Sequence, residues 1–207
     1  KYIKLTKTRY YSMEDLRANP PQADIYCTGS DQTWNSTYNR GILEPFFLEY
    51  APCHAHKIAF AASFGKEELD AWEQEETKQL LSKYKHISVR EKSAVKILQQ
   101  LSLDGIQVLD PTLHMCSEAW KKLSIQSKST SRPKPYLLVY QLNQNSLMDH
   151  YVKLISKKYN VQLLRVSTSL HQAARPGTLI FCPTPEEWLA LFANATYIVT
   201  DSFHGTA

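Results

Sequence analysis

The chain has 207 residues, of which 43% are hydrophobic and 21% are charged, and its formal net charge is +4. These proportions are ordinary for a soluble globular protein with one large or two small domains. Lysines and arginines are spread along the chain, which argues against nucleic-acid binding, and no apolar stretch approaches the roughly 18 residues of a membrane span.

The four cysteines, Cys27, Cys53, Cys116 and Cys182, lie far apart and form no CxxC pair. Three of them, all but Cys116, lie in or beside apolar runs. This usage predicts free, mostly buried thiols in a reducing compartment rather than disulfides.

The first part of the chain alternates short apolar runs with longer charged segments. Continuously apolar runs are typical of strands in parallel sheets, and apolar residues repeating every three or four positions indicate helices. The sequence predicts strands at 23–27, 57–62, 86–90 and 106–109, and helices at 67–84 and 91–102.

A polar segment rich in Ser, Lys and Pro, residues 124–135, reads as a linker. The alternation then resumes, and Pro185 stands at the favoured first turn of the last predicted helix. The sequence predicts strands at 136–142, 161–167, 178–182 and 196–201, and helices at 146–159 and 185–195.

Alternating strands and helices define an α/β fold. We expect two Rossmann-like lobes, residues 1–123 and 136–207, each with a parallel sheet covered on both faces. In this architecture ligands bind beyond the carboxyl ends of the strands, in the cleft between the lobes.

Small polar residues follow two strands of the first lobe, in the segments "GSD" and "SFG". Gly29, Ser30 and Ser63 are candidates for lining a substrate site because of this position. Asp31 could accept hydrogen bonds from a hydroxyl-rich substrate, or it could simply cap the next turn.

Arg90 ends a third predicted strand. A guanidinium there can grip a carboxylate or phosphate with two parallel hydrogen bonds. The plainer alternative is an arginine paired with Glu91 or with another carboxylate.

The last strand runs into "DSFHGTA". If a helix begins near Gly205, its amide groups and those of Thr206 would form an anion site. His204 could then donate a proton to a bound substrate, or it could merely hydrogen-bond the loop. The only metal-like segment, "CHAH" at 53–56, is too compressed for the usual ligand spacings, so no metal is expected.

Five segments in this order, "GSDQTWN", "KIAFAASFG", "SVREKSAVKIL", "VLDPTL" and "YIVTDSFHGTA", resemble the polysaccharide pyruvyl transferase family. The resemblance extends from about residue 24 to residue 207. It implies two lobes like those of the B-type glycosyltransferases. It also implies transfer of a pyruvyl group from phosphoenolpyruvate to a sugar, as a ketal, with release of phosphate and with no cofactor.

The resemblance further implies a cytoplasmic enzyme that acts on a glycan precursor, with peripheral association at the inner membrane face where the sugar is lipid-linked. His204 and Arg90 match the family's histidine and arginine that handle phosphoenolpyruvate. Asp31 is a candidate base for the sugar hydroxyl. Members often carry an arginine two residues before the histidine, where this chain has Ser202, which is a further candidate for substrate binding.

Two other functions compete with this interpretation: a nucleotide-sugar glycosyltransferase of the same architecture, and a non-catalytic relative that binds glycans or anions. The chain contains no GxGxxG, GxxxxGK[ST] or GxSxG motif, which weakens the case for nucleotide hydrolysis and for α/β-hydrolase chemistry. Family members begin with an additional strand and continue into a helix after "HGTA", so we expect this chain to be the middle part of the enzyme.

Overall fold

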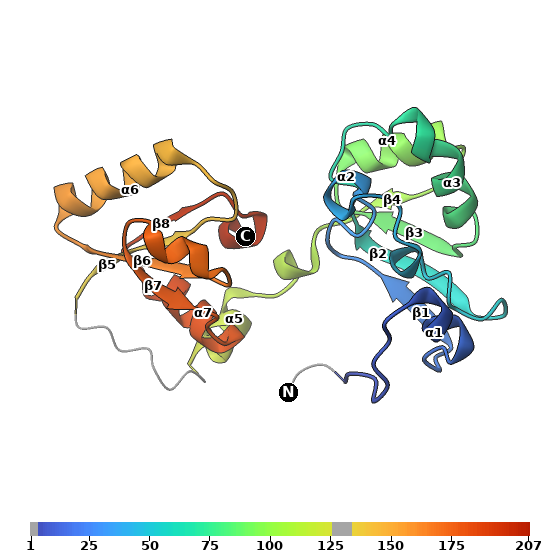
Figure 1. The fold of residues 1–207 in the computed structure, drawn as a ribbon, viewed down its shortest axis with the longest axis horizontal. Helices are drawn as coiled ribbons and strands as arrows, with labels where there is room; N and C mark the ends of the chain where they lie inside the picture. Colours follow the sequence, from blue (N-terminus) through green and yellow to red (C-terminus); the bar gives the residue numbers. More distant parts are fainter. Residues whose placement is uncertain (1–3, 126–133) are drawn as a thin grey trace. The chain divides into compact units, whose positions relative to one another are not determined.

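The computed structural model describes residues 4–125 and 134–207, and the chain divides into two compact units, Lys1–Pro111 and Thr112–Ala207 (Figure 1). Each unit contains one four-stranded sheet in which every neighbouring pair of strands is parallel. The predicted α/β class with two parallel sheets is therefore confirmed.

The first unit orders its strands as β1-β2-β3-β4, the same order as in the sequence. Its elements are α1 (Met13–Ala18), β1 (Ile25–Thr28), α2 (Ser36–Asn39), η1 (Glu44–Phe47), β2 (His56–Ala62), α3 (Ala71–Leu81), β3 (His86–Val89), α4 (Lys92–Gln100) and β4 (Ile106–Gln107).

This sequential order explains why the first sheet has a single core. Crossover connections between parallel strands are right-handed, so strands added in one direction place every connection on the same face. Figure 1 shows α3 and α4 together on one side of the strands. Accordingly Trp34, Phe47, Leu81 and Leu98 pack in one buried cluster with inward residues of β2 and β3.

The opposite face of the first sheet is exposed among the described residues, which corrects the prediction of a sheet covered on both faces. Ile25 is 56% exposed, Phe60 43% and Ile106 65%. The physical reason is the strand order, because no connection crosses to this face. Apolar runs identified the strands correctly but did not reveal which faces would be covered.

The second unit orders its strands as β7-β6-β5-β8. Its elements begin with η2 (Pro111–Leu113), which straddles the boundary, and continue with α5 (Ser117–Ser124), β5 (Tyr136–Tyr140), α6 (Ser146–Tyr159), β6 (Gln162–Ser167), η3 (Leu170–Ala174), β7 (Thr178–Phe181), α7 (Pro185–Ala193), β8 (Tyr197–Thr200) and α8 (Phe203–Thr206).

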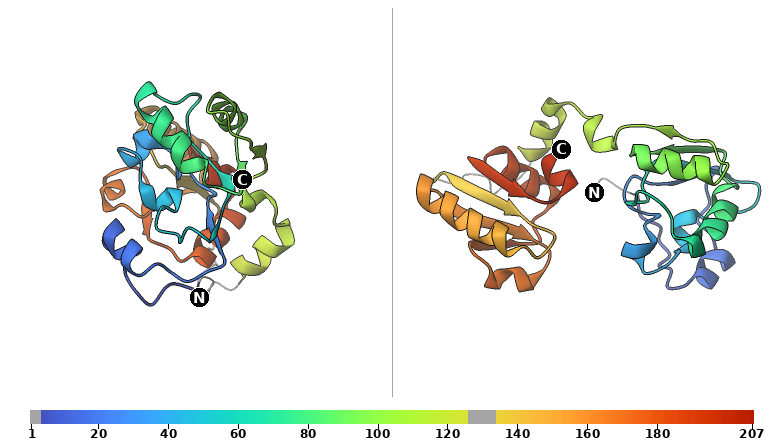
Figure 2. Two further views of the ribbon diagram at one scale, coloured as in Figure 1. Left: turned by 90° about the vertical axis from the view of Figure 1, so that its right-hand side faces the viewer. Right: turned by 90° about the horizontal axis from the view of Figure 1, so that it is seen from above.

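Both faces of the second sheet are covered. Leu137 and Val139 pack with Val152 of α6, whereas Leu138 and Leu164 pack with α7. Figure 1 shows α6 and α7 on opposite sides of the strands, and Figure 2 shows α6 lying along the sheet after a 90° turn. The direction of winding changes after β7, because the chain returns past β5 to add β8 at the other edge.

Two sequence-based boundaries differ from the structure. Helix α5 packs against α7 and belongs to the second unit, so this unit begins at Thr112 rather than after the predicted linker. Most of that linker, 126–133, lies outside the described residues.

The four cysteines are free thiols, as predicted, but all four are exposed, so the prediction that they are mostly buried was wrong. Cys27, for example, points to the open face of the first sheet, since β1 buries the alternate residues.

The helices that cover the second sheet have strong start signals. Asn145 precedes α6, and its side chain accepts a hydrogen bond from the Met148 amide at 3.1 Å. Thr184 and Glu187 form a reciprocal capping box at the start of α7, followed by Pro185 as its first residue. These caps satisfy amide groups that a helix start leaves unbonded, and they confirm the predicted starts at 146 and 185.

Candidate functional site

The carboxyl ends of β1, β2 and β3 lie side by side in the first unit, and they bring the predicted site residues together. The Ser63 amide donates a hydrogen bond to the Asp31 carbonyl at 3.2 Å. The Arg90 guanidinium donates to the Ser30 carbonyl at 3.2 Å. Three strand ends that are separate in the sequence thus form one polar cluster.

The backbone conformation and surroundings of Gly29 require a glycine. Its φ is +119°, and a Cβ at this position would collide with the Phe60 carbonyl oxygen. The end of β1 therefore passes very close to β2, which only a residue without a side chain permits. The close approach of the two strands is enough to explain why position 29 is a glycine, and no contact with a substrate is needed for this explanation.

Arg90 is largely buried, with 14% of its side chain exposed, and carboxylates surround it. Its Nη1 donates to Asp110 Oδ2 at 3.1 Å, and the carboxylates of Asp31 and Glu91 each lie 3.8 Å from guanidinium nitrogens. Asp110 is itself fully buried as a side chain. The pairing of Arg90 with a carboxylate, which the sequence offered as the alternative to ligand binding, is thus present. It fixes the guanidinium at the strand end.

Sequence reasoning did not identify Glu91 as an organising residue. Its Oε1 accepts hydrogen bonds from the Ser63 hydroxyl at 2.7 Å and from the Phe64 amide at 3.2 Å. The Ser63 side chain, 1% exposed as a residue, is therefore engaged inside the protein. The available signal was a glutamate immediately after the strand-end arginine. Its partners, however, come from the segment that follows β2, 27 or 28 residues away in sequence.

Asp31 makes the turn contact that the sequence offered as one of two alternatives. Its Oδ1 accepts a hydrogen bond from the Gln32 amide at 2.8 Å, which is the local turn contact. Its side chain nevertheless remains 73% exposed. The carboxylate is therefore accessible to a ligand in solution.

In the second unit the winding reverses between β5 and β8, and this is where open α/β sheets form a ligand crevice. Thr200 ends β8 and donates its hydroxyl hydrogen bond to the Tyr140 carbonyl at the end of β5, at 2.7 Å. The "SFHG" segment follows directly. The predicted residues Ser202, His204 and Gly205 therefore lie at the switch point of this sheet.

Asp201, which sequence reasoning did not single out, ties the two loops of this switch point together. Its carboxylate accepts hydrogen bonds from the amides of Leu142 and Asn143, at 2.7 and 2.9 Å, and from the Asn143 side chain at 3.2 Å. Partial burial opposes ionisation of this carboxyl, but the hydrogen bonds from Leu142 and Asn143 outweigh it and lower the pKa of Asp201. The aspartate therefore stays ionised and holds the β5–α6 loop.

Ser202, Gly205 and Thr206 make a local cap, which differs from the predicted anion site. Ser202 is buried and its hydroxyl accepts a hydrogen bond from the Gly205 amide at 3.2 Å, while its carbonyl accepts one from the Thr206 amide at 3.1 Å. These two amides are engaged by Ser202 in this conformation. The third and fourth amide groups of the four-residue helix α8 are thus bonded within the cap.

His204 lies on α8 and is exposed. Its ring meets the Phe203 ring edge to face, with centroids 5.2 Å apart. An accessible imidazole at the switch point of an α/β sheet is suited to exchange a proton with a bound ligand.

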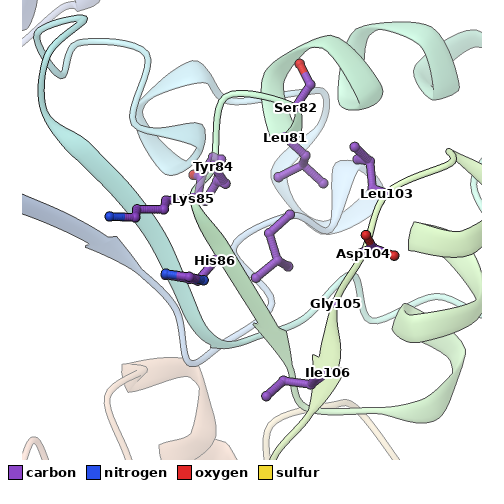
Figure 3. Close-up of a pocket in the computed structure, with 10 residues that line it drawn as sticks. Leu81, Ser82, Tyr84, Lys85, His86, Leu103, Asp104, Gly105 and Ile106 are labelled. Carbon is purple, nitrogen blue, oxygen red and sulfur yellow. The ribbon is translucent and has the colours of Figure 1, made fainter.

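A pocket of about 400 Å³ lies elsewhere in the first unit (Figure 3). Leu81 and Ile87 line it together with the polar side chains of Lys85, His86 and Asp104. It lies at the amino ends of β3 and β4, whereas Arg90 and Glu91 follow the carboxyl end of β3. It is therefore separate from the cluster of strand-end residues.

The fold and the strand-end residues define an α/β protein with polar residues at the carboxyl ends of two parallel sheets. The model of the polysaccharide pyruvyl transferase family matches residues 1–207, so the chain belongs to this family. Searches of curated proteins and of solved structures found no match. Among the described residues, no helix is both long and apolar enough to cross a membrane.

Proposed function

We propose that this chain transfers the pyruvyl group of phosphoenolpyruvate to two hydroxyls of one sugar in a polysaccharide precursor, forming a ketal and releasing phosphate. The observation that carries the proposal is the accessible His204 at the switch point of the second sheet. Membership in a family of polysaccharide pyruvyl transferases supports the type of group transferred.

The reaction needs a proton donor, and His204 is our candidate. A proton from its imidazolium reaches the methylene carbon of phosphoenolpyruvate, which becomes a methyl group, and positive charge develops at the adjacent carbon. The first sugar hydroxyl bonds to that carbon. The carbon–oxygen bond to phosphate then breaks, and the second hydroxyl takes its place.

The protons balance over these reaction steps. The two hydroxyls release two protons, and the overall reaction places one on the new methyl group and one on the departing phosphate. A base must first accept a hydroxyl proton, and Asp31 is our candidate because its carboxylate is exposed. Arg90 is our candidate for binding an anionic group of phosphoenolpyruvate, since its ion pairs fix a guanidinium at a strand end.

We further propose that the two units correspond to the two lobes of a B-type glycosyltransferase architecture. Two parallel α/β sheets in succession support this correspondence. The inner membrane face, where lipid-linked sugar precursors are made, is the location that the proposed reaction favours.

A direct assay separates this function from its rivals. The full chain is incubated with phosphoenolpyruvate or with nucleotide sugars, each with a panel of sugar acceptors, and phosphate release and product mass are measured. Phosphate release with an acceptor that gains the mass of a pyruvate ketal is expected. Transfer of a glycosyl group would instead establish a glycosyltransferase, and sugar or anion binding without any product would establish a binding protein.

A further inference from the structure

The β5–α6 loop, Gln141–Asn145, has the sequence QLNQN, in which four of five side chains are amides and none is charged. It leaves the carboxyl end of β5 at the switch point of the second sheet. Figure 1 shows this loop running beside α8, and the hydrogen bonds from Leu142 and Asn143 to Asp201 fix that proximity.

The loop is held from two sides. On one side Asp201 accepts three hydrogen bonds from Leu142 and Asn143. On the other side Gln141 is buried, and its Oε1 accepts a hydrogen bond from Arg165 Nη1 at 2.7 Å. Arg165, with 0% exposure, also bonds Asp149 of α6 at 2.7 Å. A loop fixed in this way loses little conformational freedom when a ligand binds.

The side chains that this loop turns to solvent suit a neutral, hydroxyl-rich ligand. Asn143 and Gln144 are exposed, and an amide offers both a donor and an acceptor to a hydroxyl. Leu142 is 58% exposed and Phe203 45%, so apolar surface is available for the carbon face of a sugar ring. The Phe203 ring also lies against His204.

We propose that Gln144, Leu142 and Phe203 form the subsite for the acceptor sugar, a neutral hexose or N-acetylhexosamine. This inference rests on the proposed function, because the hydroxyls must reach the carbon next to the one that His204 protonates. The uncharged loop fits the sugar better than it fits the anionic phosphoenolpyruvate.

Two variants and one matched control test the subsite in the full chain. Gln144→Ala removes an exposed amide, and Phe203→Leu removes the aromatic ring while keeping an apolar side chain. Gln162→Ala removes an exposed amide at the start of β6, at the amino end of the parallel strands, whereas the β5–α6 loop follows the carboxyl end of β5. Thermal melts of all four proteins verify that each variant is folded.

The probes are methyl glycosides of glucose, galactose, mannose and N-acetylglucosamine, with binding followed by ligand-observed NMR. We expect the wild type and Gln162→Ala to bind at least one glycoside equally well. Gln144→Ala and Phe203→Leu should each weaken that binding by about 3- to 10-fold, as expected for one lost hydrogen bond or ring contact. Binding of phosphoenolpyruvate, measured by calorimetry, should not change.

The outcomes distinguish this subsite from the proposed function. Failure of all four glycosides to bind, or binding that neither variant weakens, overturns the subsite. Phosphoenolpyruvate turnover with an unchanged acceptor KM in both variants also overturns it while the proposed function stands. Glycoside binding that depends on Gln144 and Phe203, without phosphate release from phosphoenolpyruvate, supports the subsite and overturns the function.

Discussion

The two sheets have the same number of strands and the same parallel pairing, yet they are wound differently. The first adds its strands in sequence order and collects its helices on one face, whereas the second reverses direction and has helices on both faces. A reversal separates two neighbouring loops and opens a crevice at their strand ends. Strand order therefore gives the second sheet a switch point of this kind, which the first sheet lacks among the described residues.

The polar groups at the two sets of strand ends differ accordingly. In the first unit, the Arg90–Asp110 ion pair and the Glu91 hydrogen bonds join three strand ends tightly. In the second unit, Asp201 holds one loop by its backbone and leaves neighbouring side chains exposed. The first arrangement fixes the Arg90 guanidinium in place, and the second leaves uncharged amide side chains of the β5–α6 loop exposed.

The largest expected effect concerns the switch point. His204→Asn should lower kcat by about 10²- to 10⁴-fold, because asparagine keeps a polar side chain but cannot deliver a proton as an acid. The affinity for phosphoenolpyruvate, measured by calorimetry, should remain within a few-fold. His150→Asn, an exposed histidine on α6, is the matched control and should leave kcat unchanged.

One further result bears on this role of His204. A variant that keeps its kcat but loses phosphoenolpyruvate affinity would assign His204 to binding instead of proton transfer.

The difference in winding predicts a difference in stability. Leu138→Ala, in the sheet covered on both faces, should reduce the free energy of unfolding by about 2–5 kcal/mol. Ile25→Ala, on the open face of the first sheet, should cost about 1 kcal/mol or less because the side chain is already half exposed. Denaturant unfolding measures both, and similar losses would mean that the open face is covered in solution.

Arg90 can be tested against its own ion-pair partner. Arg90→Ala should weaken phosphoenolpyruvate binding by about 2 kcal/mol, since it removes a charge-assisted contact to the anion. Asp110→Ala breaks the same ion pair but keeps the guanidinium, so it should lower the melting temperature with a smaller loss of affinity. If calorimetry shows equal losses of phosphoenolpyruvate affinity in the two variants, Arg90 has a structural role and does not bind the anion directly.

The smallest effect is a pH dependence at Asp201. Because its pKa in the folded protein is lowered below the ordinary value of an aspartate, its hydrogen bonds stabilise the protein at neutral pH. This stability is lost as the pH falls through the folded-state value. Asp201→Asn should therefore cost about 1 kcal/mol at pH 7, and thermal melts should show a smaller difference from wild type at pH 3. A difference that is independent of pH would contradict the role of the charge.

Local patterns were sufficient to predict most elements. The apolar runs predicted the strands within a few residues, except that β4 is limited to Ile106–Gln107, and the caps placed the starts of α6 and α7. The position of Arg90, Ser63 and His204 after strands followed from the same patterns. These features depend on neighbours within a few residues, which is why one sequence reveals them.

Only the tertiary structure decided which partners the strand-end residues have. Glu91 binds groups in the segment after β2, and Asp201 binds the β5–α6 loop 58 or 59 residues earlier. Ser202 accepts a hydrogen bond from the Gly205 amide, which the sequence analysis had assigned to an anion site. The open face of the first sheet likewise follows from strand order. Side-chain periodicity is the same for every order of parallel strands, so the sequence pattern determined the strands, and the packing of the whole chain determined their neighbours.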